Sequence, residues 1–244
     1  KINLLFNNAG IGGGGVFGNE EERADWERTF AVCWYGVYYG CLAFLPALVA
    51  SDEARIVNTS SINGFWASLG PNVPHTAYCA AKFAVKGFSE ALITDLRLNS
   101  PHVEVSVVMP GHIGTSIAIN SGLVLGKPEP LNLADDDIRA LRERMMKTAG
   151  SGAELIMNMS DDQIRETMHQ RGVDFRDNAP TTAGDAAQVI LDGVRARKWR
   201  ILVGDDAHHL DEQVRGNPEA AYELDFLEKI WEEGDLVELV NIIE

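Results

Sequence analysis

Cysteine is scarce in this chain of 244 residues. The three that occur, Cys33, Cys41 and Cys79, form no C-x-x-C pair and are too few for a disulfide framework. This excludes the common cysteine-based zinc motifs, so we predict no metal site. A chain that does not depend on disulfides suits a reducing compartment, and we predict a cytoplasmic protein.

Basic residues are also in short supply, with 21 lysines and arginines against 36 aspartates and glutamates, a net charge of −15. Such a balance disfavours nucleic acid and anionic membrane surfaces as partners. Residues 205–244 alone hold 13 acidic and two basic side chains, so the rest of the chain is close to neutral. We interpret residues 205–244 as an acidic helical C-terminal extension, whose charge says little about the active centre.

Uncharged runs are short with one exception, residues 31–50, which contain no charged side chain. Twenty such residues are long enough for a membrane span. The run also holds three tyrosines, two glycines and Pro46, and no basic cluster flanks it. This content favours a helix buried within the protein or against a partner subunit, and we predict no membrane span.

Short apolar runs alternate with long helical patterns along the chain. Candidate strands are residues 2–6, 55–59, 103–109 and 200–203, and helical patterns cover residues 21–51, 75–99 and 182–197. This alternation predicts an α/β fold in which a parallel sheet lies between two layers of helices. Residues 112–180 are longer than an ordinary crossover and contain helical patterns at 135–147 and 161–169. We interpret them as a helical insertion that covers the substrate.

The glycines of residues 10–15 satisfy the pattern G-x-G-x-x-G after a candidate strand, which matches the dinucleotide fingerprint. A genuine fingerprint opens a strand–helix–strand unit of about thirty residues, with an acidic residue ending the second strand. Here the next candidate strand begins only near Arg55. We therefore reject the fingerprint and expect a flexible loop over a cleft.

Tyr78 and Lys82 are four positions apart, so both project from one face of a helix. The pKa of a phenol is near ~10, and a neighbouring ammonium group lowers it because it favours the phenolate. Such a pair can act as general acid and base on an alcohol or a ketone. Ser60 and Ser61 end a candidate strand and supply a hydroxyl for the same substrate oxygen. A serine hydrolase built on Ser61 has little support, because the sequence lacks G-x-S-x-G.

Four motifs occur in a fixed order along the chain. They are Asn7-Asn8-Ala9-Gly10, Ser60-Ser61, Tyr78 with Lys82, and Pro110-Gly111-His112-Ile113-Gly114-Thr115. In order and spacing they resemble the short-chain dehydrogenase/reductase family in its single-domain form, well over residues 1–120 and more loosely over 180–204. The resemblance implies a Rossmann-type fold and hydride transfer between NAD or NADP and a secondary alcohol or ketone.

The same resemblance implies roles for individual residues. Tyr78 is the proton donor or acceptor, Lys82 lowers its pKa and binds the nicotinamide ribose, and Ser61 orients the substrate oxygen, with Ser60 as second choice. The implied cofactor-binding residues are Asn8, Ala9, Gly10, Tyr78, Lys82, Pro110, Gly111, Ile113 and Thr115. From its place in the Pro-Gly loop, and apart from the resemblance, His112 is expected to be an exposed loop residue, and the alternative is that it touches the substrate. The implied partners are an apolar small-molecule substrate and, through the helices at 31–50 and 75–99, further copies in a homodimer or homotetramer.

The chain also departs from the family. Cys33 stands where the family has an asparagine that supports a proton relay, and a thiol is a poor substitute for an amide. Ser61 precedes Tyr78 by 17 positions, more than is usual in the family, which implies a longer loop over the cleft.

The gravest departure is that the family's first three strands, with the glycine loop that seats the pyrophosphate, have no counterpart here. Residues 1–204 then form an incomplete Rossmann-like domain, and since the chain begins with Lys1 we expect a partial sequence that binds nicotinamide cofactor poorly or not at all. The alternative to an oxidoreductase is a non-catalytic relative that serves as a dimerisation or binding module, or an inactive fragment.

Overall fold

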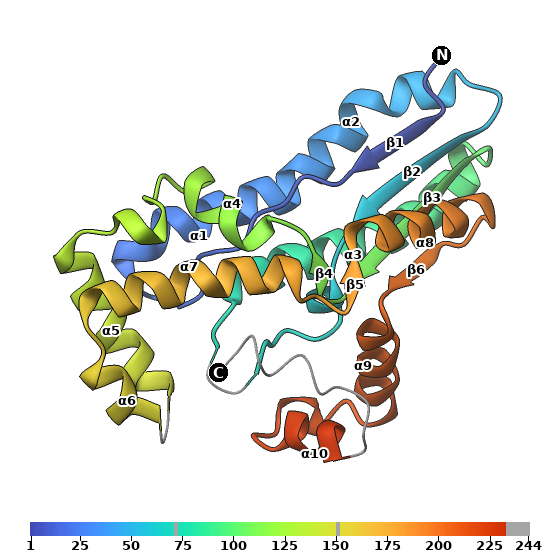
Figure 1. Ribbon diagram of the computed structural model, residues 1–244. Coiled ribbons are helices and arrows are strands. Elements are labelled where there is room, and N and C mark those ends of the chain that lie inside the picture. Colours follow the sequence, from blue (N-terminus) through green and yellow to red (C-terminus); the bar gives the residue numbers. More distant parts are fainter. Residues whose placement is uncertain (71–72, 150–151, 233–244) are drawn as a thin grey trace.

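The computed structural model describes residues 1–70, 73–149 and 152–232. Its main sheet has four parallel strands in the order β1-β2-β3-β6 (Figure 1). The strands are β1 Leu4–Asn7, β2 Ala54–Thr59, β3 Val103–Pro110 and β6 Arg200–Val203. Each overlaps a run that the sequence predicts as a strand, and the predicted parallel pairing is confirmed.

The two central strands are buried because their β-branched residues pack against helices on both faces. Ile56 and Val57 in β2 and Val108 in β3 have no exposed surface. In β1, by contrast, Leu4 is 42% and Phe6 is 41% exposed, and no described strand pairs with its outer side. β1 is therefore an edge strand with one uncovered face.

Helices cover both faces of the sheet, which confirms the three-layer α/β arrangement (Figure 1). α2 Gly36–Val49 and α3 Thr76–Asn99 lie on one face, and α8 Ala183–Arg195 lies on the other. Val85 of α3 packs with Ile56 in one core cluster, and Ala186 of α8 packs with Val57 in another. Short 3₁₀ turns occur at Glu20–Glu22, Ile62–Gly64 and Pro130–Asn132.

The uncharged run 31–50 lies in a long helix formed by α1 Arg23–Phe30, a π-helical turn at Ala31–Tyr35, and α2. Cys41 and Leu48 of α2 face the core, whereas Tyr39 and Leu42 are exposed. Among the described residues, Glu20–Val49 is the one helical run with the length and hydropathy of a membrane span, and 22% of its most apolar window is buried. The absence of a membrane span stays a prediction.

Residues 112–180 form a mostly helical insertion. It runs through β4 Ile113–Gly114, α4 Ile117–Val124, α5 Asp135–Thr148, α6 Ala153–Asn158, α7 Asp161–Asp177 and β5 Thr181–Thr182. α5 and α6 stand away from the sheet, and α7 leads back to it (Figure 1). Ile138, Met145 and Ile164 form a small core there, with Met159 and Met168 packed against it. Several of the methionines thus fill a local core.

The C-terminal extension is helical over its described part, residues 205–232, and packs against the domain. It contains α9 Asp205–Gly216, a 3₁₀ turn at Ala220–Tyr222 and α10 Phe226–Glu232. Trp66 is buried against Phe226, and its Nε1 donates a hydrogen bond to the carbonyl oxygen of Ala221 at 2.7 Å. The extension therefore touches the loop that follows Ser61.

Candidate active site

The carboxyl ends of β1 and β2 meet at one edge of the sheet, because parallel strands end on the same side. Asn7 pairs in register with Asn58, and its Nδ2 donates to Asn58 Oδ1 at 2.8 Å. Thr59 Oγ1 donates to Asn8 Oδ1 at 2.9 Å. Asn8 and Ala9 are exposed there, so the backbone after β1 is open to a ligand.

Tyr78 and Lys82 lie on one face of α3, with Lys82 Nζ 5.3 Å from the centre of the Tyr78 ring. Lys82 is only 2% exposed, and its Nζ donates a hydrogen bond to the carbonyl oxygen of Thr59 at 2.9 Å. This bond fixes the ammonium group at the end of β2. The predicted proximity of the two side chains is confirmed, while their catalytic roles remain predictions.

Burial controls the protonation of this pair. It raises the pKa of Tyr78 above its usual range, and Cys33 raises it further, while a hydrogen bond with the Ser61 side chain acts in the opposite direction. Burial lowers the pKa of Lys82. Burial therefore dominates the pKa of Tyr78 in this structure, and the expected acidification by Lys82 stays a prediction.

The two serines after β2 have different surroundings. Ser60 is buried and its Oγ donates to the backbone carbonyl oxygen of Lys82 at 2.8 Å. A Cβ on Gly64 would overlap with Ser60 Oγ, so this hydroxyl is tightly enclosed. Ser61 Oγ accepts a hydrogen bond from the amide of Asn63 at 3.2 Å and also interacts with Tyr78. The geometry therefore favours Ser61 as the serine that faces the substrate.

Cys33 lies near Tyr78 and Lys82, in the π-helical turn. It is fully buried, and its Sγ donates to the carbonyl oxygen of Ile11 at 3.2 Å. A Cβ on Gly10 would lie 3.5 Å from Lys82 Nζ and 3.8 Å from Cys33 Sγ, so Gly10 brings the backbone between these two side chains. The thiol thus anchors the segment after β1 by a weak hydrogen bond.

The glycine run does not form a flexible loop, and that expectation is wrong. A Cβ on Gly14 would overlap with the backbone of Trp26, and one on Gly15 with the carbonyl oxygen of Pro74. The Gly15 carbonyl oxygen accepts a hydrogen bond from the Thr76 amide at 3.1 Å, and that of Gly14 accepts from the Ala77 amide at 3.3 Å. These carbonyls hold the first turn of α3, two residues before Tyr78.

The segment 110–115 lies at the end of β3. Pro110 ends the strand, Ile113 belongs to β4, and Gly111 donates its amide hydrogen to the carbonyl oxygen of Val203 at 2.9 Å. His112 is 5% exposed, so the expectation of an exposed loop histidine is wrong. Its Nε2 bonds to the carbonyl oxygen of Phe175, 63 residues away, which no local pattern in the sequence could indicate.

His75, the residue before α3, contacts the ring of Tyr78. Its ring centroid is 4.7 Å from that of Tyr78 at an interplanar angle of 32°. Burial lowers the pKa of His75 to about 4, so the ring is neutral at pH 7. The same imidazole lines an open, mostly apolar cavity of about 550 Å³, together with Cys79, Phe83 and Tyr222. In the sequence, the signal for His75 is its position three residues before Tyr78, about one helical turn away.

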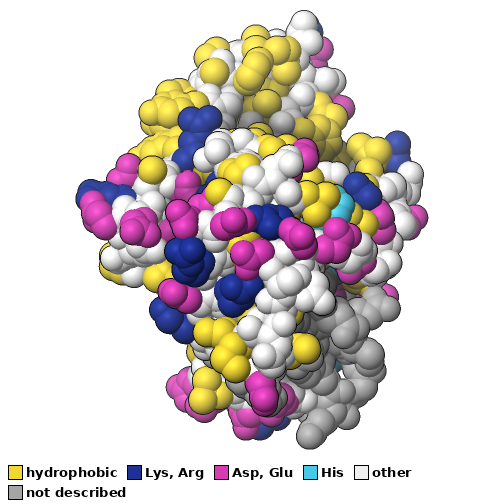
Figure 2. Space-filling view, turned by 60° about the vertical axis from the view of Figure 1, so that its left-hand side comes forward, with side chains coloured by type: hydrophobic (Ala, Val, Ile, Leu, Met, Phe, Trp, Pro, Cys, Tyr) yellow, Lys and Arg dark blue, Asp and Glu magenta, His cyan; other side chains and the backbone are white. Residues whose placement is uncertain are grey.

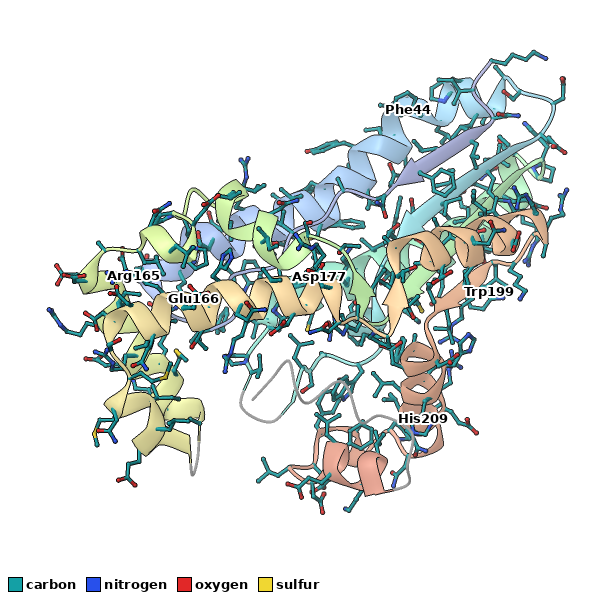
Figure 3. The ribbon with its side chains drawn as sticks, in the orientation of Figure 1. Phe44, Arg165, Glu166, Asp177, Trp199 and His209 are labelled. Atoms are coloured by element: carbon teal, nitrogen blue, oxygen red, sulfur yellow. The ribbon has the colours of Figure 1, made fainter. Side chains whose placement is uncertain are left out.

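Polar side chains outside this region include Arg165 and Glu166 on α7 and His209 on α9 (Figure 3). In the described part of the chain, no group of three or more histidine, cysteine, aspartate or glutamate side chains could hold a metal ion. The candidate chemistry is therefore concentrated at the ends of β1, β2 and β3.

Known proteins share this chain's sequence over about half its length. The profile of the family described as short chain dehydrogenase matches residues 1–123. The Putative oxidoreductase SadH of Mycobacterium tuberculosis strain H37Rv is 40% identical over 128 residues, 52% of this chain and 45% of that protein. A 3-ketodihydrosphingosine reductase of Bacteroides thetaiotaomicron is 33% identical over 145 residues, 58% of this chain and 50% of its own. The chain thus spans about half the length of these curated relatives.

Solved structures share the fold over most of the chain. A short-chain dehydrogenase/reductase from Burkholderia phymatum in complex with NAD covers 94% of this chain with a TM-score of 0.56 and 24% identity, and the match covers 68% of that protein. One from Burkholderia cenocepacia in complex with NADP covers 90% with a TM-score of 0.56 and 19% identity, over 66% of its own length. At these identities the likeness establishes the fold alone.

Proposed function

The chain belongs to the short-chain dehydrogenase family, and on this basis we propose that it serves an NAD- or NADP-dependent oxidation–reduction of a secondary alcohol or ketone. The observation that carries the proposal is the meeting of Tyr78, Ser61 and Lys82 at the end of β2. A separate cavity with mostly apolar walls is lined by His75, whose ring contacts that of Tyr78, and on this ground we propose an apolar small-molecule substrate.

The residues at the strand ends fit one half of a nicotinamide cofactor. Gly10 offers backbone without a side chain beside Lys82 Nζ, and Asn8 and Ala9 are exposed next to it. Together with residues 110–115 they would hold the nicotinamide and its ribose. The described residues offer no glycine loop at the start of a helix for the pyrophosphate, since the glycine run is occupied by packing against Trp26 and Pro74.

When bound, the nicotinamide ring gives or takes a hydride. The chain's own side chains handle the proton and the substrate oxygen. Ser61 Oγ would hydrogen-bond the carbonyl oxygen, and Tyr78 Oη, which is protonated in the buried site, would donate its proton to that oxygen during reduction and regain it during oxidation. Lys82 then stabilises the phenolate that remains, because a buried anion needs a nearby cation.

The test is Tyr78→Phe in the complete gene product, assayed with a panel of secondary alcohols and ketones through absorbance of the reduced nicotinamide. We expect turnover to fall by about a hundredfold or more, because the proton donor is lost. Tyr39→Phe is the matched control, since Tyr39 lies on α2 away from Tyr78 and the substitution keeps the apolar ring for the subunit contact proposed below. Unchanged turnover in Tyr78→Phe would falsify the proposal.

Cofactor affinity forms a second test. Because the pyrophosphate loop is missing from the described residues, we propose that the 244-residue chain by itself binds NADH and NADPH weakly and turns over poorly. Calorimetric titration should give no tight binding with either nucleotide. Tight binding would show that other residues seat the pyrophosphate.

A second candidate function, a dimerisation or binding module, is favoured by exposed apolar surface. Apolar side chains gather at the top of the view in Figure 2, the level at which Figure 1 places α2 and β1. Phe44 projects outward from α2 (Figure 3), and Tyr39 and Leu42 on the same helix are also exposed. We propose that this face forms a homodimer or homotetramer. A complete gene product with no hydride transfer across the panel would favour the module over the enzyme.

A further inference from the structure

Asp206, on the C-terminal extension, has a buried carboxylate directly behind the segment 110–115. It is 5% exposed, and its Oδ2 accepts a hydrogen bond from the amide of His112 at 2.6 Å. A Cβ on Gly111 or on Gly204 would overlap with the carboxylate. The backbone therefore approaches Asp206 from both sides as closely as only glycine allows.

The segment is held from three elements at once. Gly111 bonds to Val203 of β6, and the His112 amide bonds to Asp206 of α9. The His112 ring packs 4.3 Å from the ring of Phe175 in α7, and Nε2 lies 2.7 Å from the Phe175 carbonyl oxygen. Because a carbonyl only accepts, Nε2 carries the proton and donates. The segment 110–115 is thus the junction of sheet, insertion and C-terminal extension.

The carboxylate of Asp206 is surrounded by backbone amides. Oδ2 accepts the bond from the His112 amide, and the amides of Ala207 and of Asp206 itself also interact with the carboxylate. A buried carboxylate is costly unless it is hydrogen-bonded, and the bond to His112 is the one that links it to the segment 110–115. Asp205, the preceding residue, already supplies an exposed negative charge to the first turn of α9.

We propose that Asp206 is a positioning residue for the cofactor site: it holds the backbone of Gly111 and His112, so α9 of the C-terminal extension is part of that site. The inference rests on the proposed function, in which Pro110, Gly111 and Ile113 border the nicotinamide. An ionised or amide oxygen at position 206 keeps the segment in place, and loss of that oxygen lets it move away from the cofactor.

The first test needs no cofactor. Hydrogen–deuterium exchange of the 244-residue chain is compared for wild type, Asp206→Ala, Asp206→Asn and the control Asp205→Ala. We expect exchange in peptides covering 110–115 to rise about tenfold or more in Asp206→Ala, because a charge-assisted hydrogen bond is lost. Asp206→Asn retains an acceptor oxygen and should restore most of the protection, and Asp205→Ala should match wild type.

The second test uses the complete gene product. Asp206→Ala should raise the KM for the nicotinamide cofactor about tenfold while kcat changes little, since Tyr78, Ser61 and Lys82 are untouched. Unchanged exchange at 110–115, or a rise spread over all peptides, overturns the proposal, as does a local rise with an unchanged cofactor KM. If Asp206→Ala does not fold, Asp206→Ser replaces it, because its hydroxyl is too short to reach the His112 amide. If the wild-type gene product shows no activity, the proposed function is contradicted. The exchange experiment by itself then tests whether Asp206 holds the segment 110–115.

Discussion

At the scale of single residues, the adjacent Ser60 and Ser61 have different proposed roles: Ser60 stabilises the fold, and Ser61 binds the substrate oxygen. Ser61→Ala should lower kcat about a hundredfold, because one hydrogen bond to the substrate oxygen is lost. Ser60→Ala should instead lower the free energy of unfolding by about 1 kcal/mol, because the bond from its Oγ to the Lys82 carbonyl oxygen disappears. Steady-state assays and urea unfolding separate the two effects. Equal losses of kcat in two equally stable variants would contradict the assignment.

His75 makes a prediction about pH. Its pKa is about 4 in the folded chain, below the value of about 6.5 for an unfolded histidine. The unfolded state therefore binds more protons between these values, so the free energy of unfolding should rise as pH increases from 4 to 6.5, by at most about 3 kcal/mol from this residue.

The measurement is urea unfolding of wild type and His75→Gln at several pH values between 4 and 7. The variant should lose much of the rise in the free energy of unfolding across this window. His208→Gln, at an exposed position on α9, serves as the control and should retain it. A wild-type slope preserved in His75→Gln would refute the role of His75.

The residues of the site differ in how far the sequence could predict them. The spacing of Tyr78 and Lys82 needs only a helix, so it could be read directly. The choice of Ser61 over Ser60 follows from the resemblance, and the contacts of Ser60 now give a physical reason for it. The burial of His112 could not be predicted, because its partners Phe175 and Asp206 are 63 and 94 residues away.

At the scale of elements, the glycine run acts as a support for α3. Gly14 has φ +59° and no room for a Cβ against Trp26, so Gly14→Ala should lower the free energy of unfolding by about 2 kcal/mol or more. Gly87 lies within α3 with nothing near its would-be Cβ, and Gly87→Ala should stabilise by about 0.5–1 kcal/mol. Chemical denaturation of both variants checks the opposite signs. If Gly14→Ala leaves the free energy of unfolding unchanged, residues 10–15 do not support α3, and the interpretation as a flexible loop is correct after all.

Elements with a strong pattern were predictable, and short ones were not. The strands β2, β3 and β6 each contain a short run rich in apolar β-branched residues, and the long helices follow apolar faces. The two-residue strands β4 and β5 are set by pairing between distant segments, Ile113 with Thr181 and Gly114 with Thr182. The flexible-loop interpretation of residues 10–15 was wrong because glycine signals close packing as well as freedom.

At the scale of the whole molecule, the exposed face of α2 predicts self-association. Multi-angle light scattering should give a dimer or tetramer in solution. Leu42→Glu, at an exposed position of this face, should weaken association at least about tenfold, because a charge would be buried in an apolar contact. Leu155→Glu, at a highly exposed position of α6, is the control and should leave the mass unchanged. A monomer at all concentrations would contradict the prediction.

The overall architecture was predictable because strand–helix alternation constrains the topology of an α/β domain. The docking of the C-terminal extension was not predictable. Its acidic composition indicates a solvated surface, although one side of it is apolar and packs on Trp66.

The bond between Trp66 and Ala221 joins residues 155 positions apart. An indole in such an enclosed apolar environment emits at shorter wavelength than one in water, and it shifts to the red once water reaches it. Fluorescence in a variant that retains only this tryptophan would therefore report release of α9 and α10 from the rest of the fold, in real time and without any added dye.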